Sequence, residues 1–254
     1  MKGMFESMDE EVIVGKNPVI EALKSGRSVN KIIISEHLNM ATRKQVEKAG
    51  KQAGTVIQKV PKSRLNQITK GNHQGIIAYV ASYQYASIED LFQRAEDKNE
   101  TPFFIILDEL EDPHNLGSIL RTADATGVHG IIIPKHRSVG LTATVAKTSA
   151  GAIEYVPVAR VTNIRDTIEE LKSRHVWVAG TDADGTEDYR QLDGQTPIAL
   201  VIGNEGRGMS RLVKDSCDWT VRLPMKGHVS SLNASVATSL LLYEVYRKRH
   251  PFGE

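Results

Sequence analysis

Residues 102–110 read PFFIILDEL, an almost unbroken apolar run that leads into acidic residues. A run with so little polar alternation is typical of a strand buried on both faces, as in a parallel sheet. Further strand-like runs follow at residues 130–134, 156–161, 176–182, 198–206 and 219–224. Helix-like segments separate most of them, including one over 142–154 and a last one from Val236 on. The pattern predicts a parallel α/β domain over residues 102–254.

The residues upstream predict a smaller module with a different balance of charge. Strand-like runs at 29–35, 55–60 and 75–83 alternate with short helix-like segments, which predicts a small α/β domain over residues 1–85. Residues 11–80 hold twelve lysines and arginines but four acidic residues, although the whole chain carries only +1. A basic module joined to a mildly acidic one favours nucleic-acid binding, and a lysine-rich solvated surface is the alternative.

Residues 86–101 connect the two modules and contain a short polar helix-like segment followed by charged residues, so we interpret them as a linker. The composition, with 40% hydrophobic and 25% charged residues, is that of an ordinary globular protein. No apolar run approaches the roughly 20 residues of a membrane span, and the acidic N-terminus lacks an apolar signal core. We therefore expect a cytoplasmic protein without a membrane partner.

Cysteine and histidine usage narrows the chemistry. Cys217 is the only cysteine, which excludes an internal disulfide and a cysteine-based zinc site. The histidines show no metal-ligand spacing, so no metal is expected. The glycines of GNEGRG (203–208) have the wrong spacing for a dinucleotide fold, and their glutamate would repel a pyrophosphate. Neither a P-loop nor a G-x-S-x-G elbow occurs, which argues against nucleotide hydrolases and serine hydrolases.

Ligands of open α/β sheets bind beyond the carboxyl ends of the strands, so the residues that follow each strand are the candidates. The polar residues that stand out there are Asn115, Arg121, Glu205, Ser231 and Asn233. Nearby glycines would let the backbone approach a flat ligand closely. Each of these polar residues also has an interpretation without a ligand. Asn115 and the polar cluster at 230–235 can cap helices, and Arg121 and Glu205 can be solvated surface residues.

Three blocks resemble the motifs of the SpoU (TrmH-type) RNA ribose 2′-O-methyltransferases of the SPOUT superfamily. They are LDELEDPHNLGSILRTADATGVHGIII (107–133), IALVIGNEGRGMS (198–210) and LPMKGHVSSLNASVATSLLLYE (223–244). In the first module, VIVGKNPVIEAL (12–23) and NHQGIIAYV (72–80) resemble the L30e-like substrate-binding domain of the subgroup that methylates a guanosine of 23S rRNA.

This resemblance implies an α/β catalytic domain with a deep trefoil knot, which periodicity could not reveal, and S-adenosylmethionine bound in the knot. It implies catalytic roles for Asn115, Arg121, Glu205, Ser231 and Asn233. The implied cofactor positions are Gly180, Thr181, Gly203, Leu223, Met225 and Leu232. It also implies a homodimer in which the arginine of one subunit can serve the cofactor of its partner.

The same resemblance implies an RNA partner, most specifically 23S rRNA. The expected RNA contacts are Lys16, Asn17, Arg64, His73 and Arg121. Three alternatives stay open: a tRNA target, a different rRNA nucleotide such as a resistance-type adenosine, and a noncatalytic RNA-binding assembly factor.

Overall fold

The computed structural model describes residues 11–24, 27–81, 83–228 and 231–252. Contacts divide the chain into two compact units. One comprises residues 1–84 with the short segment 140–144, and the other comprises residues 85–139 and 145–254. The boundary at 84/85 lies one residue from the end expected for the first module.

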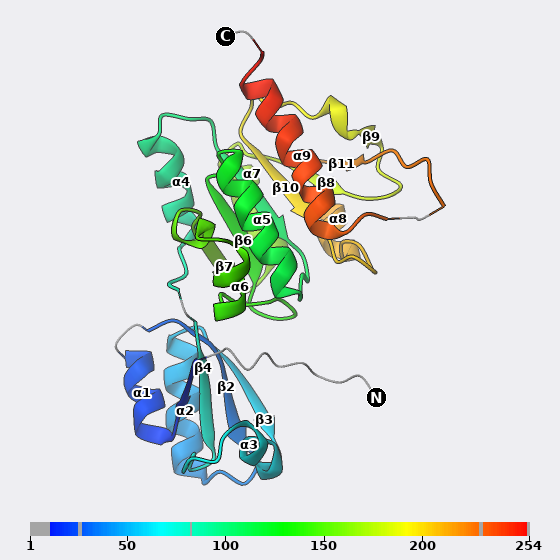
Figure 1. The fold of residues 1–254 in the computed structure, drawn as a ribbon. Helices are drawn as coiled ribbons and strands as arrows, with labels where there is room; N and C mark the ends of the chain where they lie inside the picture. Colours follow the sequence, from blue (N-terminus) through cyan, green and yellow to red (C-terminus); the bar gives the residue numbers. More distant parts are fainter. Residues whose placement is uncertain (1–10, 25–26, 82, 229–230, 253–254) are drawn as a thin grey trace. The chain divides into compact units, whose positions relative to one another are not determined.

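The first unit is built on a mixed four-stranded sheet with the order β1-β4-β2-β3 (Figure 1). Its strands are β1 (Glu11–Val14), β2 (Val29–Ser35), β3 (Val56–Val60) and β4 (Ile76–Val80). Its helices are α1 (Lys16–Lys24), α2 (Met40–Gln52) and α3 (Lys62–Ile68). Strands β2 and β3 are parallel, whereas β4 is antiparallel to β1 and β2.

Both faces of this sheet are covered, which explains the continuous apolar run in β2. Ile32 and Ile34 share one core cluster with Val19 of α1 and Val46 of α2. Ile33, between them in sequence, shares the opposite cluster with residues of α3 and β4. Successive side chains of a strand point to opposite faces, so three adjacent isoleucines serve two cores.

The second unit contains a seven-stranded sheet with the order β7-β6-β5-β10-β8-β11-β9, and every pair of neighbours is parallel. The strands are β5 (Phe103–Leu107), β6 (Gly130–Pro134), β7 (Val158–Val161), β8 (Trp177–Thr181), β9 (Glu187–Asp188), β10 (Ile198–Ile202) and β11 (Trp219–Arg222). All five residues of β5 are completely buried. The parallel sheet predicted from PFFIILDEL is confirmed, and the implied knot stays a prediction.

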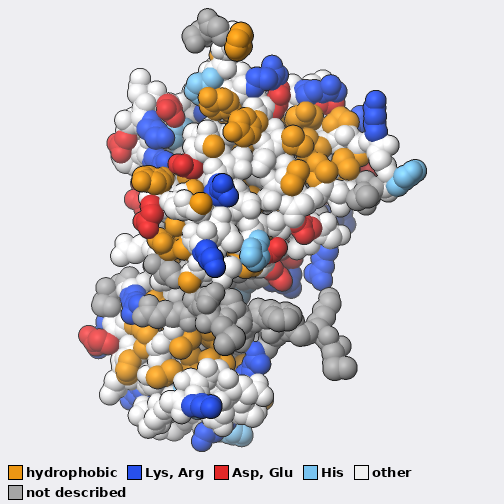
Figure 2. All heavy atoms as spheres, in the orientation of Figure 1, with side chains coloured by type: hydrophobic (Ala, Val, Ile, Leu, Met, Phe, Trp, Pro, Cys, Tyr) orange, Lys and Arg blue, Asp and Glu red, His pale blue; other side chains and the backbone are white. Residues whose placement is uncertain are grey.

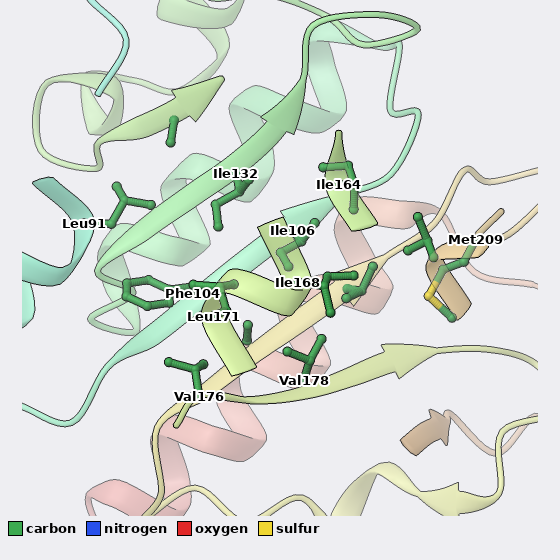
Figure 3. Packing of buried hydrophobic residues seen from close by; sticks show 14 of the residues in the cluster. Leu91, Phe104, Ile106, Ile132, Ile164, Ile168, Leu171, Val176, Val178 and Met209 are labelled. Carbon is green, nitrogen blue, oxygen red and sulfur yellow. The ribbon is translucent and has the colours of Figure 1, made fainter. Parts of the chain in front are cut away.

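Helices lie on both faces of this sheet (Figure 1). They are α4 (Ile88–Asp97), α5 (Pro113–Ala125), α7 (Ile164–Ser173), α8 (Arg211–Ser216) and α9 (Ala234–Arg249), with short 3-10 turns at Ala152–Glu154 and Tyr189–Gln191. A further helix, α6 (Ala143–Thr148), has its first two residues in the segment grouped with the first unit. Helices α5 and α9 pack against each other. Figure 3 shows the core on the α7 side, where Phe104 and Ile106 of β5 share a cluster with Ile168 of α7.

Two expectations about local structure are corrected. The segment 86–101 is not a free linker, because Leu91 and Phe92 of α4 are buried in the core of the second unit, with the Phe92 and Phe104 rings 4.9 Å apart. The single helix expected over 142–154 is interrupted after α6. Ala150 and Gly151 have φ values of 50° and 93°, and the left-handed region ends a right-handed helix.

The last turn of α9 is fixed to the sheet by a half-buried arginine. The Arg249 guanidinium donates hydrogen bonds to the carbonyls of Gly194 and Thr101, each at 2.6 Å, and more weakly to those of Pro102 and Thr196. The Arg249 guanidinium is thus held by backbone carbonyl groups and not by a carboxylate, and these carbonyls gain hydrogen-bond donors. This contact anchors the far end of the helix whose first residues border the candidate site.

His129, just before β6, is fully buried and neutral. The Phe103 N–H donates to Nδ1 at 3.0 Å, so Nε2 carries the proton and donates to Glu100 Oε2 at 2.9 Å. Burial lowers the pKa of His129, and the hydrogen bond to Glu100 opposes this shift only in part.

We expect the free energy of unfolding to decrease as the pH falls below about 6.5, the ordinary pKa of histidine in an unfolded chain. The folded chain binds the proton less readily than the unfolded chain, so His129 stabilises the fold above that pH and this contribution is lost towards the lower folded pKa. In His129→Gln the amide can accept from Phe103 and donate to Glu100 without titrating. Urea unfolding at pH 7 and pH 5 should show that the free energy of unfolding decreases less in the variant than in the wild type. Equal decreases in the two proteins would contradict the role assigned to His129.

Among the described residues, no helix is both long and apolar enough to cross a membrane.

Candidate active site

A cavity of about 780 Å³ opens beyond the carboxyl ends of β8, β10 and β11. In an open parallel sheet, this edge is where ligands bind. Four segments line it: residues 181–183, 202–208 and 221–225, and residues 231–241 at the start of α9, of which Ser231, Leu232, Ala234, Ala237 and Leu241 contribute. Apolar side chains such as Leu223 and Leu241 share the wall with charged ones such as Asp182 and Arg222.

The loop after β10 is a tight turn that presents Glu205. Backbone hydrogen bonds of 3.0 and 2.8 Å pair Asn204 with Gly208, and Asn204 Oδ1 accepts from the Gly206 N–H at 3.0 Å. A Cβ on Gly203 would lie 2.2 Å from the Met209 nitrogen, so only glycine fits. Gly208 has a φ of 68°, which also favours glycine. The glycines of GNEGRG therefore shape a turn.

Three side chains from distant parts of the sequence meet at this turn. Asn115 of α5 donates from Nδ2 to Glu205 Oε1 at 2.8 Å. Asn233 donates from Nδ2 to the same oxygen at 2.6 Å and to Asn115 Oδ1 at 3.0 Å. The Ala234 N–H also donates to Glu205 Oε1, at 3.0 Å. One carboxylate oxygen thus joins the starts of α5 and α9.

The members of this cluster differ in which of their polar atoms remain available to a ligand. Asn233 uses its amide nitrogen in the cluster, and its Oδ1 caps α9 by accepting from the Ser235 and Val236 N–H groups at 3.0 and 3.4 Å. Glu205 Oε1 accepts three hydrogen bonds, whereas Oε2 accepts none from the residues that the structure describes. Glu205 is exposed and lines the cavity. Its Oε2 is therefore the acceptor that a ligand can reach.

The two asparagines differ in whether they cap a helix. Asn115 is not the cap of α5, because Asp112 accepts from the His114 N–H at 2.8 Å and Pro113 occupies the first helical position. Asn115 is buried inside the first turn, where its side chain serves the cluster. Asn233 is the cap of α9 and a member of the cluster at once, so capping and site formation are one arrangement.

Arg121 lies apart from the cluster within one chain. It is exposed on α5, and its guanidinium makes no hydrogen bond or ion pair with the described residues. It is not among the residues that line the cavity. Ser231, also predicted for catalysis, is exposed at the cavity wall.

Most positions expected to hold a cofactor surround the cavity. Thr181, Gly203, Leu223, Met225 and Leu232 line it. Gly180 does not, because a Cβ there would meet Met209 Cε at 2.7 Å and Cys217 Sγ at 2.9 Å in the core. Cys217 is half-buried against the core, and burial raises the pKa of its thiol to about 12.

Sequence reasoning missed the charged residues of the cavity: Asp182, Arg207 and Arg222. Asp182 follows β8 directly, so its position at a strand end was the available signal. Its carboxylate lies 2.8 Å from Lys214 Nζ. Burial raises the pKa of Asp182, but the hydrogen bonds from Lys214 and the Asp184 N–H outweigh burial and leave the pKa below its ordinary value.

In the first unit, the four positions expected to contact RNA have different surroundings. Asn17 is exposed, Lys16 is half-buried, and Arg64 is half-buried and donates to Gln67 Oε1 at 3.3 Å. His73 is buried: its Nδ1 accepts from the Gly75 N–H at 2.9 Å, and its Nε2 pairs with Asn66 Oδ1 at 2.8 Å. With both ring nitrogens engaged, His73 fixes its loop and does not present a ring to RNA.

No group of three or more His, Cys, Asp or Glu side chains that could hold a metal ion occurs within the described ranges.

Comparisons with known proteins match both units. The model of the SpoU rRNA Methylase family matches residues 102–243, and the model described as RNA 2′-O ribose methyltransferase substrate binding matches residues 12–86. A Bacillus subtilis (strain 168) protein named "Putative TrmH family tRNA/rRNA methyltransferase YacO" is 59% identical over 248 residues, covering 98% of this chain and 100% of the relative. A Staphylococcus haemolyticus protein of the same family name is 54% identical, covering 97% and 99%.

Solved structures agree. The SpoU methyltransferase AviRb from Streptomyces viridochromogenes, in complex with the cofactor AdoMet, aligns with a TM-score of 0.60 at 26% identity and covers 95% of this chain and 91% of its own. An AdoMet-bound rRNA methyltransferase from Sinorhizobium meliloti aligns with a TM-score of 0.57 at 27% identity, covering 94% and 87%.

Proposed function

The chain belongs to the SpoU rRNA methylase family and methylates ribose 2′-hydroxyls of tRNA or rRNA with S-adenosylmethionine; we propose that its target is a guanosine of 23S rRNA in the cytoplasm. The observation that carries the methyl-transfer chemistry is the cluster of Asn115, Glu205 and Asn233 on the wall of the cavity. The choice of 23S rRNA rests on the resemblance of the first unit and on its surplus of basic residues.

The cavity suits S-adenosylmethionine chemically. Its wall combines apolar residues, Ile202, Leu223 and Leu232 among them, with acidic and basic groups at the edge. An adenine can lie against the apolar part while the loop backbones meet its polar edge. Glu205 offers negative charge to a cationic ligand, and Arg207 and Arg222 can hold a carboxylate. When bound, the cofactor supplies an electrophilic methyl group on a sulfonium.

The chain must hold the ribose in line with that methyl group and accept a proton from the 2′-hydroxyl. Arg121 is unsuited to accept it, since a guanidinium does not deprotonate in proteins. We assign the proton to Glu205 Oε2, the free acceptor at the cavity wall. Asn115 and Asn233 hold that carboxylate in place, and Arg121 binds a phosphate of the target RNA.

Replacing Arg121 with lysine should keep the charge but lose the planar pair of donors that fits a phosphate. We expect the KM for RNA to rise and kcat to fall, each by about tenfold, the size of one charge-assisted contact. Steady-state methylation assays give both constants, and calorimetry should show unchanged affinity for S-adenosylmethionine. Turnover near that of the wild type would rule out a specific guanidinium role.

We further propose that the enzyme acts as a homodimer through α9. Val236, Leu240 and Tyr243 are 49%, 43% and 52% exposed and lie along one side of the helix. Hydrophobic side chains gather over α9 on the face that Figure 2 shows. A second copy that covers this side would also explain why Arg121 has no role within one chain: it can act at the cavity of the partner.

The deciding experiment maps 2′-O-methyl groups on total RNA from cells with and without the gene, together with methylation by the purified protein. Loss of one methylated guanosine in 23S rRNA, restored in vitro, is the expected result. A missing tRNA methyl group, or one at another rRNA nucleotide, would overturn the 23S guanosine target. Absence of cofactor binding and of any change in methylation would favour an assembly factor.

A further inference from the structure

A second cavity, of about 530 Å³, lies at the same edge of the parallel sheet, beyond β5, β6 and β7. None of the residues predicted for catalysis or cofactor binding contributes to it. Its wall is made by Asp108 and Glu109 after β5, by Pro134, His136 and Arg137 around the end of β6, by residues 162–165 after β7, and by Ser210, Leu212 and Val213.

The acidic groups of this cavity are already engaged, while two of its basic groups are available. Asp108 is buried and its Oδ2 accepts from the Ser210 N–H at 2.8 Å. Glu109 pairs with Arg137 at 2.8 Å. His136 and Arg165 are exposed, and their side chains form no hydrogen bond or ion pair with residues in the described ranges. The cavity therefore offers the guanidinium of Arg165 and the imidazole of His136 to an anion.

The remaining wall provides the other contacts of a nucleotide. Leu212 is 64% exposed, an unusual position for a leucine, and together with Pro134 it offers an apolar surface to a base. Thr162 and Ser210 bring hydroxyl groups. Phosphate, sugar and base can thus each find a suitable group within one cavity.

The backbone at this cavity is held in an unfavourable conformation. Glu109 and Arg137, which form the ion pair, have φ values of 58° and 52°. The left-handed region is unfavourable for a residue with a side chain, and such positions concentrate at ligand sites. Strain at both partners of an ion pair that borders a cavity is consistent with a binding role.

One loop separates the two cavities. Residues 203–208 line the first cavity, and Ser210 lines the second. Asn204 Nδ2 donates to the Glu109 carbonyl at 3.0 Å and so ties this loop to the strand end that borders the second cavity. An RNA strand with its ribose at Glu205 can therefore continue across the loop into the second cavity.

We propose that the second cavity binds a nucleotide of the substrate RNA that flanks the methylated one, with its phosphate on Arg165 and His136 and its base against Leu212. This inference rests on the proposed function only in taking RNA as the substrate. It gives the catalytic unit its own part in holding the RNA around the target, separate from the basic first unit.

Arg165→Ala and His136→Ala test the proposal, with Arg211→Ala as the matched control. Arg211 is also exposed on the neighbouring α8, but it does not line the cavity. Fluorescence anisotropy with an rRNA fragment containing the target should show about tenfold weaker binding for Arg165→Ala and a salt dependence reduced by about one unit. Arg211→Ala should bind within about twofold of the wild type, because the Arg211 side chain does not line the cavity and pairs instead with Asp215 at 3.6 Å.

Affinity for S-adenosylmethionine and the unfolding temperature should be unchanged in all three variants, which separates a lost RNA contact from a damaged fold. Equal RNA affinity and equal salt dependence in Arg165→Ala, His136→Ala and the wild type would overturn the proposal while leaving the proposed function intact. A wild-type protein that methylates no RNA would instead refute the proposed function, and this site with it.

Discussion

Replacing Glu205 with glutamine is expected to lower the rate of methyl transfer by about 10²- to 10⁴-fold, the usual contribution of a positioned proton acceptor. Glutamine has the same shape as glutamate, and its amide oxygen can accept the three hydrogen bonds that now reach Oε1 from Asn115, Asn233 and Ala234. Its nitrogen would stand where Oε2 stands and would donate instead of accepting. The substitution removes the acceptor and keeps the cluster.

Single-turnover methylation with saturating RNA and cofactor measures the rate of the methyl-transfer step. Calorimetric affinity for S-adenosylmethionine and the unfolding temperature should stay close to those of the wild type. Glu111→Gln is the control, because Glu111 is an exposed carboxylate on the loop after β5 that does not line the cavity. If Glu205→Gln transferred methyl groups within about threefold of the wild type, Glu205 would be only a structural tie between α5 and α9.

The sequence was sufficient for those parts of the fold that depend on local pattern. The apolar run at 103–107 identified a buried strand because both faces of β5 are covered, and the order of strands and helices gave the parallel architecture. The α4 segment resembles a linker because polar residues dominate a short helix, although Ile88, Leu91, Phe92 and Ala95 follow the spacing of one apolar helix face. A few apolar residues in a mostly charged segment are weak evidence from sequence that the segment packs into a core.

The candidate site was predictable as a set of residues but not as a set of contacts. Strand ends and motifs brought Asn115, Glu205 and Asn233 together, and the structure joins them through one oxygen atom. The hydrogen-bond partners in the folded chain determine which polar atoms remain available to a ligand. The sequence pattern does not reveal these partners. His73 shows the same limit: the resemblance implies an RNA contact at this position, whereas both ring nitrogens form hydrogen bonds inside the domain.

We expect Leu240→Glu to convert the proposed homodimer to a monomer that no longer methylates RNA. Leu240 is the middle residue of the apolar side of α9, and burying an unpaired carboxylate against a second copy should weaken association by at least about 100-fold. Sedimentation velocity would measure the change. Met40→Glu alters a still more exposed apolar residue of the first unit and should leave the proposed dimer intact. A Leu240→Glu dimer would contradict the assigned interface.

Mixing two inactive variants tests whether the arginine acts across that interface. In a dimer of Arg121→Ala with Glu205→Gln, one cavity has an intact Glu205 and, from the other subunit, an intact Arg121. Random reassortment makes half of the dimers mixed, each with one complete site, so about a quarter of wild-type activity should return if Arg121 serves the partner cavity. If Arg121 served its own cavity, neither site of the mixed dimer would be complete and the mixture would stay inactive. Recovery must also vanish when both variants carry Leu240→Glu, because complementation requires the two subunits to associate.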